Sequence, residues 1–333
     1  ILNNQTYQID TIPDLKLNVK GGKSYYYNGF GDPTYGDTIF KAIKLKTDFL
    51  NSTNKKDFDE TIIKLVPQVF STNEFGATIA TITILDKNIT LLKEHNIDCK
   101  GLTVMKNEKT FFWSGKYHSN MNQRDTIETQ LNVLEKFNPI IPEAYEDCTY
   151  LMLANLMPSL QLKAINQLPK APKLIVTDTM NYWMDNCMDD LLLVIAKTNV
   201  LIINDEEAVQ LSKKKNLNEA ASKILTMGPS FLIIKKGADG ASLFTENKVF
   251  KCPPFNVEKC IDPTGAGDTF AGAFIGHLSH NNSLSFDSMK LGVIKACAMA
   301  SFCVEDFGGN NIIYKNSIEL QDRINHLQSK IIH

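Results

Sequence analysis

The stretch Asp262-Pro263-Thr264-Gly265-Ala266-Gly267-Asp268-Thr269-Phe270 joins a loop signal, two glycines and the start of an apolar segment. Asp-Pro-Thr is typical of a loop, and the glycines allow the backbone to turn tightly. Small and apolar residues continue to Leu278, which predicts a helix that begins inside Gly265-Ala266-Gly267. The first N–H groups of a helix have no acceptor inside the helix, and the helix dipole adds positive potential there. The stretch therefore predicts an anion-binding turn.

Asp268 lies in the first turn of the same predicted helix, where the dipole favours the ionised carboxylate. A carboxylate is poor at holding a phosphate, but it can take a proton from an attacking hydroxyl group. The amides of the turn suit the charge that develops on a transferred phosphoryl group. A helix N-cap that follows a glycine turn is the structural alternative for the same residues.

The overall composition predicts an ordinary globular protein with one large core, or one core and a small appendage. Of the 333 residues, 43% are hydrophobic and 22% are charged. The net charge of −2 gives no basic surface for nucleic acid or acidic membranes, and no apolar run approaches membrane-spanning length. The seven cysteines include no C-x-x-C spacing, which predicts reduced, mostly buried thiols and a cytoplasmic location.

Three other local patterns predict no special site. Residues 1–8 lack the basic and apolar regions of a signal peptide, and the absence of an initiator Met predicts a processed or missing N-terminus. Gly22-Lys23-Ser24 resembles the end of a phosphate-binding P-loop, but Leu17 occupies the position of its first glycine. His277 and His280 have no nearby Cys or carboxylate, so we expect solvated histidines at a helix end rather than a metal site.

The second half of the sequence alternates short apolar runs with helical segments. The apolar runs are Tyr150–Ala154, Lys173–Thr177, Val200–Ile203 and Phe231–Lys235. The helical segments are Leu160–Leu168, Met188–Lys197, Glu206–Lys213 and Glu219–Met227. This alternation predicts a parallel sheet that is covered on both faces, with ligands bound beyond the carboxyl ends of its strands. The polar residues that follow the runs, and that predict a cleft, are Asn155, Asp178, Asn204, Asp205, Glu207, Lys236 and Gly237.

The run from Asp262 to Phe270 resembles the signature of the ribokinase-like (PfkB) family of sugar and nucleoside kinases. The resemblance is good from about Lys109 to Asn310 and weak before that. It implies an α/β fold with a central, mostly parallel β-sheet flanked by helices, and a small β-sheet lid. We accordingly expect one kinase domain over residues 1–333, with lid segments at about 10–30 and 100–125.

The resemblance also assigns functional residues. It makes Asp268 the catalytic base and Gly265, Ala266 and Gly267 the anion hole. The nucleotide-binding residues that it implies are Asn204, Lys235, Lys236, Gly237, Gly240, Gly267 and Asn310. The substrate-binding residues are Asp10, Gly21, Gly22, Asn155 and Asp268, and Asp178 with Asn181 resembles the D-x-N stretch on the substrate side.

The cofactors that the resemblance implies are ATP and Mg²⁺, with K⁺ as a third ion. Asn204 and Glu207 resemble the N-x-x-E element, whose Glu organises Mg²⁺ through water. The same pair is also a good helix-capping pattern, and the two roles are compatible. Asp262 and Thr264 correspond to residues that bind a monovalent cation in this family.

The first third of the chain is less regular. Residues 77–84 and 109–117 are strand-like, a helix is predicted near Lys87–His95, and residues 31–74 are expected to form surface helices and loops. The strand at 109–117 has polar and aromatic side chains on both sides, which suits a sheet that covers a cleft. A surface hairpin without a moving role is the alternative.

A small sugar is the favoured substrate, because carboxylates and amides suit hydroxyl groups. A nucleoside is the nearest alternative, since Tyr25–Tyr27 and Phe111–Trp113 could stack on a base. A nucleotide-binding regulator without turnover is a third interpretation, against which the complete base and glycine motif argues. A Rossmann dehydrogenase would need G-x-G-x-x-G after a first strand, which the sequence lacks. The sequence is compatible with a homodimer but does not fix the oligomeric state.

Overall fold

A computed structural model describes residues 14–18, 24–28, 71–72, 77–81, 86–105, 108–118, 121, 124–313 and 315–331. The predicted surface segments between residues 31 and 70 lie outside these ranges. None of the helices in the described ranges is long and apolar enough to cross a membrane.

The centre of the fold is a six-stranded sheet in the order β12-β11-β10-β9-β8-β7. Its strands are β7 (Tyr150–Leu153), β8 (Leu174–Asp178), β9 (Val200–Asn204), β10 (Phe231–Lys235), β11 (Ala241–Phe244) and β12 (Val249–Cys252). The first four are parallel to one another, and β11 and β12 add antiparallel pairs at one edge. The predicted mostly parallel sheet is confirmed.

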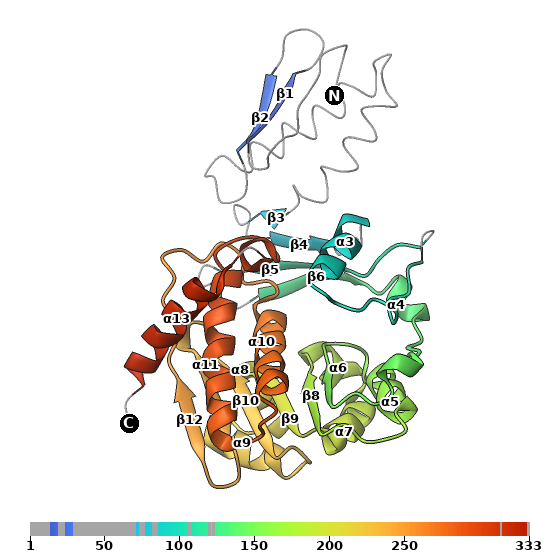
Figure 1. The fold of residues 1–333 in the computed structure, drawn as a ribbon, viewed down its shortest axis with the longest axis vertical. Helices are drawn as coiled ribbons and strands as arrows, with labels where there is room; N and C mark the ends of the chain where they lie inside the picture. The colour runs from blue at the N-terminus through green and yellow to red at the C-terminus, as the bar shows by residue number, and fades with distance from the viewer. Residues whose placement is uncertain are drawn as a thin grey trace.

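Helices cover both faces of this sheet, as Figure 1 shows. Alternate residues of a strand point to opposite faces, so Ile202 packs with Phe274 on one side and Ile203 packs with Ile195 on the other. The first face is covered by α10 (Ala266–Asn281), α11 (Phe286–Cys303) and α13 (Ser317–Lys330). The second is covered by α6 (Asn181–Asn186), α7 (Met188–Lys197), α8 (Asp205–Ser212) and α9 (Leu217–Leu225). The remaining helical segments are α3 (Asp86–Glu94), α4 (Val133–Lys136), η1 (Glu143–Tyr145), α5 (Pro158–Gln167), η2 (Gly237–Asp239) and α12 (Asn310–Ile313).

This packing corrects the expectation for His277. Its side chain is only 8% exposed, and the Nδ2 atom of Asn281 lies 3.0 Å from its Nδ1 atom. The residue lies on the inner side of α10, whereas His280 is exposed as expected. Burial lowers the pKa of His277, so its neutral form is favoured.

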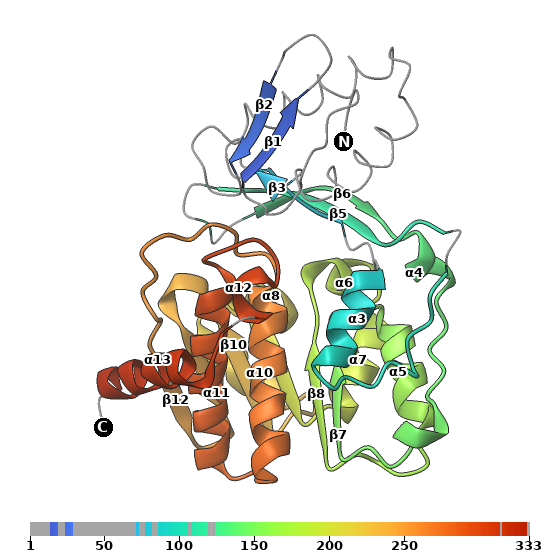
Figure 2. The ribbon, with the colours of Figure 1, turned by 45° about the horizontal axis from the view of Figure 1, so that its top comes forward.

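A second, four-stranded antiparallel sheet has the order β3-β4-β5-β6. Its strands are β3 (Ser71–Thr72), β4 (Ala77–Thr81), β5 (Phe112–Tyr117) and β6 (Arg124–Gln130). In Figure 2, β5 and β6 lie across one end of the α/β unit. The strand predicted over 109–117 is therefore confirmed as β5.

The partner of β5 is not the predicted early segment. β1 (Asp14–Asn18) and β2 (Ser24–Asn28) pair with each other, and it is β4 that pairs with β5. The sheet also extends beyond residue 125, because β6 forms its far edge. We call β3–β6 the cover sheet below.

Candidate active site

Helix α10 begins at Ala266, with Gly265 as its N-cap, so the helix starts inside the glycine turn as predicted. Gly265 has a φ of 83°, a left-handed conformation that glycine adopts without a steric penalty. The Ala266 N–H already donates to the Pro263 carbonyl at 3.2 Å. Of the three predicted anion-hole amides, those of Gly265 and Gly267 are therefore the better donors to a ligand.

The loop before this turn is held against the end of α11. The Ile261 N–H donates to the Val304 carbonyl at 2.7 Å, and the thiol of Cys303 contacts the Thr264 carbonyl at 3.6 Å. Asp262 is buried, and its Oδ1 accepts the Thr264 N–H at 2.9 Å. Burial raises the pKa of Asp262. The turn is thus part of a packed structure rather than a free loop.

A lysine ammonium lies directly beside the glycine turn. Lys235 ends β10, and its Nζ lies 3.2 Å from Oδ1 of Asp178 at the end of β8, so the ion pair spans the intervening strand β9. A Cβ atom added to Gly267 would lie only 3.1 Å from the same Nζ. Burial lowers the pKa of Lys235, but the carboxylates of Asp178, Glu207 and Asp268 outweigh it and raise the pKa. A fixed positive charge therefore adjoins the Gly267 backbone.

Asp268 reaches solvent, yet its carboxyl is perturbed by its surroundings. The protein atoms that displace water around it raise its pKa, Asp178 raises the pKa further, and Lys235 opposes both effects. The helix dipole alone predicted the opposite direction. A carboxylate with a raised pKa is a stronger proton acceptor, which suits a general base.

Asn204 and Glu207 form both bonds of a capping box at the start of α8. The Glu207 N–H donates to Oδ1 of Asn204 at 2.7 Å, and the Asn204 N–H donates to Oε2 of Glu207 at 2.8 Å. Glu207 is buried, and its negative charge helps to raise the pKa of Lys235. Within the described ranges, no group of three His, Cys, Asp or Glu side chains is placed to hold a metal. A single carboxylate still fits Mg²⁺ that is held mainly by phosphates and water.

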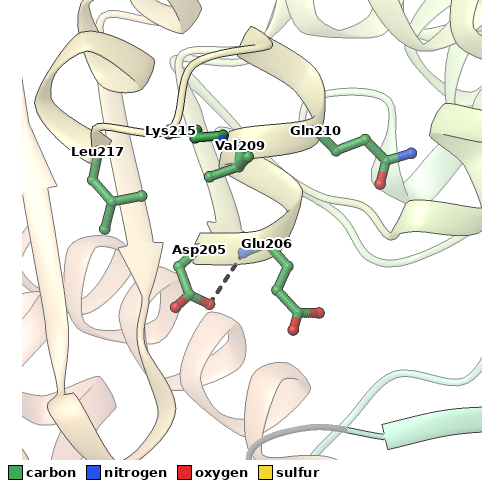
Figure 3. Close-up of a pocket in the computed structure, with 6 residues that line it drawn as sticks. All are labelled: Asp205, Glu206, Val209, Gln210, Lys215 and Leu217. Carbon is green, nitrogen blue, oxygen red and sulfur yellow. Dashed lines mark hydrogen bonds between the residues drawn. The ribbon is translucent and has the colours of Figure 1, made fainter.

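A cavity of about 450 Å³ adjoins the start of α8 (Figure 3). Its lining residues are Asp205, Glu206, Val209, Gln210, Lys215 and Leu217. The two acidic side chains at its rim repel phosphate groups. Lys235 and Gly267 offer an anionic group a more favourable environment than this cavity does.

Among the predicted nucleotide-binding residues, packing explains the glycine at position 240, whereas Gly237 and Asn310 are exposed. Gly240 has a φ of 78°, and a Cβ atom there would lie 2.2 Å from the Cys252 carbonyl oxygen, so packing alone requires glycine. The Lys236 N–H closes this turn on the Gly240 carbonyl at 2.8 Å, while Gly237 remains exposed. Asn310 is exposed at the start of α12. The Gly237 carbonyl accepts the Gly240 N–H at 3.1 Å, and the Asn310 N–H donates to the Phe307 carbonyl at 3.4 Å. Both residues stay predicted nucleotide contacts.

The predicted substrate residues fall into two groups. Asp10, Gly21 and Gly22 lie outside the described residues. Asn155 is exposed directly beyond β7, and its Oδ1 accepts the Trp183 Nε1–H at 2.8 Å.

Sequence reasoning missed three connections in the site. Asp178 was expected at a strand end, but not as the partner of Lys235. Gln161 is buried and joins the ends of β7 and β8, a task that nothing in its helical context signals. Tyr117 of β5 places its hydroxyl 3.1 Å from Oγ1 of Thr264, which connects the cover sheet to the glycine-turn loop.

Comparison with known proteins gives a family match over most of this region. The sequence model of the family described as "pfkB family carbohydrate kinase" matches residues 86–315. A cytidine kinase of Thermococcus kodakarensis is 26% identical over 204 residues, which cover 60% of this chain and 72% of that protein. A nucleoside kinase of Methanocaldococcus jannaschii is 33% identical over 120 residues, which cover 35% of this chain and 36% of that protein.

Solved structures share the fold. Ribokinase from Giardia lamblia has a TM-score of 0.60 at 15% identity, over 72% of this chain and 79% of that one. The nucleoside kinase structure of Methanocaldococcus jannaschii has a TM-score of 0.56 at 21% identity, over 72% of this chain and 76% of that one. At these identities the likeness concerns the fold.

Proposed function

This chain belongs to the PfkB family of carbohydrate kinases, and from that premise we propose that it transfers the γ-phosphoryl group of ATP to a hydroxyl of a small sugar. The observation that carries the proposal is the position of Lys235 Nζ, 3.1 Å from where a Gly267 side chain would begin. Asp268 follows in the same helical turn. A base, a cation and helix N-terminal amides thus belong to the same turn or adjoin it, which is what phosphoryl transfer requires.

In the proposed reaction, Asp268 accepts the proton of the substrate hydroxyl as its oxygen attacks the γ-phosphorus. A bond forms between that oxygen and phosphorus, and the bond from phosphorus to the bridging oxygen of ADP breaks. Lys235 and the amides of Gly265 and Gly267 face the charge that spreads over the phosphoryl oxygens. The α/β core holds these groups before substrate arrives, so little reorganisation is needed.

Two ions fit the residues present. Glu207 would orient the water shell of Mg²⁺, which neutralises phosphate charge when it is bound. Asp262 and Thr264 would hold a monovalent cation such as K⁺, since a buried carboxylate with a pKa raised by burial gains from a neighbouring cation.

We further propose that the chain forms one cytoplasmic kinase domain and that the cover sheet is its lid. The bond between Tyr117 and Thr264 supports this role, because it joins the sheet to the loop that carries the glycine turn. A lid that excludes water protects ATP from hydrolysis while the substrate reacts.

A nucleoside is the second candidate substrate. Two relatives are described as a cytidine kinase and a nucleoside kinase. In addition, Trp113 shares its face of β5 with Tyr117, and its ring lies over Gly115, where an added Cβ would be 2.3 Å from the ring. This face of β5 therefore carries two aromatic rings, of which that of Trp113 is partly exposed, and an aromatic ring suits a base.

A substrate panel tests the proposal. Purified protein with ATP and Mg²⁺ is screened for ADP release with D-ribose, D-fructose, adenosine, inosine and cytidine, and ³¹P NMR identifies the phosphate ester. We expect turnover of a monosaccharide that requires Mg²⁺. Efficient turnover of a nucleoside with inert sugars would transfer the assignment to the second candidate. Absence of ester with every acceptor would contradict the kinase proposal.

A further inference from the structure

Among the described candidates for substrate binding, Asn155 has a side chain that contacts two residues of the α6 region. It follows β7 and is exposed, whereas Trp183 on α6 is only 4% exposed. The Trp183 Nε1–H donates to Oδ1 of Asn155 at 2.8 Å, and Nδ2 of Asn155 lies 3.2 Å from the sulfur of Met180. An exposed amide is thus fixed by one buried and one neighbouring side chain.

The chemistry of these two partners determines which way the amide faces. An indole N–H can only donate, so the amide atom opposite Trp183 must be the oxygen. A thioether sulfur can only accept, so the atom opposite Met180 must be the nitrogen. Both contacts therefore select the same orientation. An amide NH₂ group has two hydrogens, and the sulfur takes only one, which leaves Asn155 as a donor toward solvent.

Asn155 lies on the same edge of the central sheet as the residues proposed for the transfer. Nε2 of the buried Gln161 donates to the Ala154 carbonyl at 2.9 Å and to the Asp178 carbonyl at 3.2 Å, which ties the ends of β7 and β8 together. Asp178 in turn pairs with Lys235 beside the glycine turn. A substrate that extends along this edge from Asp268 toward β7 would therefore meet Asn155.

Trp183 is itself rigidly placed. Its backbone N–H donates to the Met180 carbonyl at 3.1 Å, and its ring makes an edge contact with Tyr182 at 4.9 Å between ring centroids. A buried side chain with a single polar atom has few alternative positions. The polar atom of Trp183 is directed at Asn155, so the indole can set the amide without touching substrate.

We propose that Trp183 is a positioning residue for substrate recognition: it locks the amide of Asn155 as a hydrogen-bond donor to an oxygen of the phosphoryl acceptor. The inference rests on the proposed kinase function and deepens it. Trp183→Phe removes the N–H and keeps an aromatic ring, so the Asn155 amide would rotate and lose part of its bond to substrate. One hydrogen bond of this kind corresponds to a change of about threefold to tenfold in KM.

The test is a double-mutant cycle with Trp183→Phe and Asn155→Ala, measured with the panel acceptor that the wild-type protein phosphorylates best. Trp183→Phe should raise the acceptor KM about threefold to tenfold with kcat and the KM for ATP little changed. In the Asn155→Ala background, the same substitution should change the KM less than twofold. An equal effect of Trp183→Phe in both backgrounds, or no effect in either, would overturn the inference.

Two further variants keep the test decisive. Tyr182→Phe is the matched control on the same helix, and it should leave the acceptor KM unchanged. Asn155→Asp keeps an acceptor for the Trp183 N–H but replaces the outward donor, so it should raise the acceptor KM even if Trp183→Phe fails to fold. An unchanged KM in Asn155→Asp would count against the inference. Wild-type turnover of the panel reports separately on the kinase function itself.

Discussion

The strands of the α/β unit and the strands of the cover sheet are built on different principles. All five residues of β8 are buried between two layers of helices, whereas residues 125–128 of β6 are exposed. The end of β8 is fixed by core packing, and Asp178 is therefore fixed with it. The described bond from the cover sheet to the glycine-turn loop, between Tyr117 and Thr264, joins two side-chain hydroxyls.

This difference separates the groups proposed for chemistry from those proposed for closure. Phosphoryl transfer needs a base and a cation that stay in place. The packed α/β unit holds the base, Asp268, at the start of α10 and the cation, Lys235, at the end of β10. Covering a substrate needs a surface that can move, and a sheet with an exposed outer strand is better suited to that than a strand buried between helices. Substitutions in the α/β unit should therefore change kcat strongly, and substitutions in the cover sheet should change KM modestly.

The largest effect is expected for Asp268→Asn. The amide keeps the shape of the side chain but cannot accept the hydroxyl proton, and general-base catalysis contributes about 10²-fold to 10⁴-fold. We expect kcat for ADP release to fall by that factor, with ATP affinity by calorimetry and the melting temperature nearly unchanged. Turnover within about threefold of wild type would remove Asp268 from the mechanism.

Gly267→Ala should have the next largest effect. The new methyl group would begin 3.1 Å from Lys235 Nζ, so the ammonium must shift by a few tenths of an ångström, away from the position proposed for the phosphate. Hydrogen bonds to charged groups are worth about 1.5–3 kcal/mol, so we expect kcat/KM for ATP to fall about 10-fold to 100-fold.

Gly272→Ala on the same helix is the matched control. A Cβ atom at Gly272 meets nothing within 4 Å, and alanine favours the helix by up to about 1 kcal/mol. It should leave the kinetics unchanged and raise the melting temperature slightly. Equal kinetic losses in the two variants would mean that the helix, and not the ammonium position, governs the rate.

The same contrast explains how much could be predicted from sequence. A strand covered on both faces must be almost entirely apolar, so β9 and β10 were predicted almost to the residue. The start of α10 was predicted because a glycine in the left-handed conformation and a following apolar run leave few alternatives. The predicted strand ends also placed Asn155, Asp178 and Asn204 along one edge of the sheet.

Pairings between distant segments could not be read in this way. The mixed polar and aromatic pattern of β5 does not specify its neighbour, and the expected early segment 10–30 proved to contain β1 and β2, which pair with each other. The contact of Tyr117 with Thr264 joins residues 147 positions apart. The burial of His277 depended on which side of α10 faces the sheet, which three flanking polar residues obscured.

The third prediction concerns pH. Rate requires ionised Asp268, so kcat/KM should fall as the pH falls through the pKa of that carboxyl. Burial and Asp178 raise this pKa, and Lys235 lowers it. Asp178→Asn removes a negative charge and releases Lys235 to act on Asp268, and both changes lower the pKa. The acid limb of the profile should therefore move to lower pH.

Asp205→Asn serves as the control for this profile. Asp205 is an exposed carboxylate at the start of α8 and is not among the charges that act on Asp268. The acid limb of the pH profile of Asp205→Asn should coincide with that of the wild-type protein. Asp178→Asn removes the ion-pair partner of the mostly buried Lys235 side chain and should therefore lower the melting temperature. The profiles are compared at a temperature below the melting transition of this variant. A limb that stays in place or moves to higher pH in Asp178→Asn would refute the electrostatic coupling.

Tyr117→Phe should have the smallest effect and gives the sharpest test of the contrast between the two sheets. It removes the hydroxyl that meets Thr264 and leaves the ring in place, at a net cost of about 0.5–1.5 kcal/mol. If the cover sheet closes on substrate, that cost weakens closure, so the acceptor KM should rise about twofold to tenfold while kcat stays within twofold. Tyr145→Phe loses a comparable bond to the Asp98 carbonyl and should leave both constants unchanged. A lower melting temperature with an unchanged KM in Tyr117→Phe would make the sheet a static surface element, because the bond would then stabilise the fold equally with and without substrate.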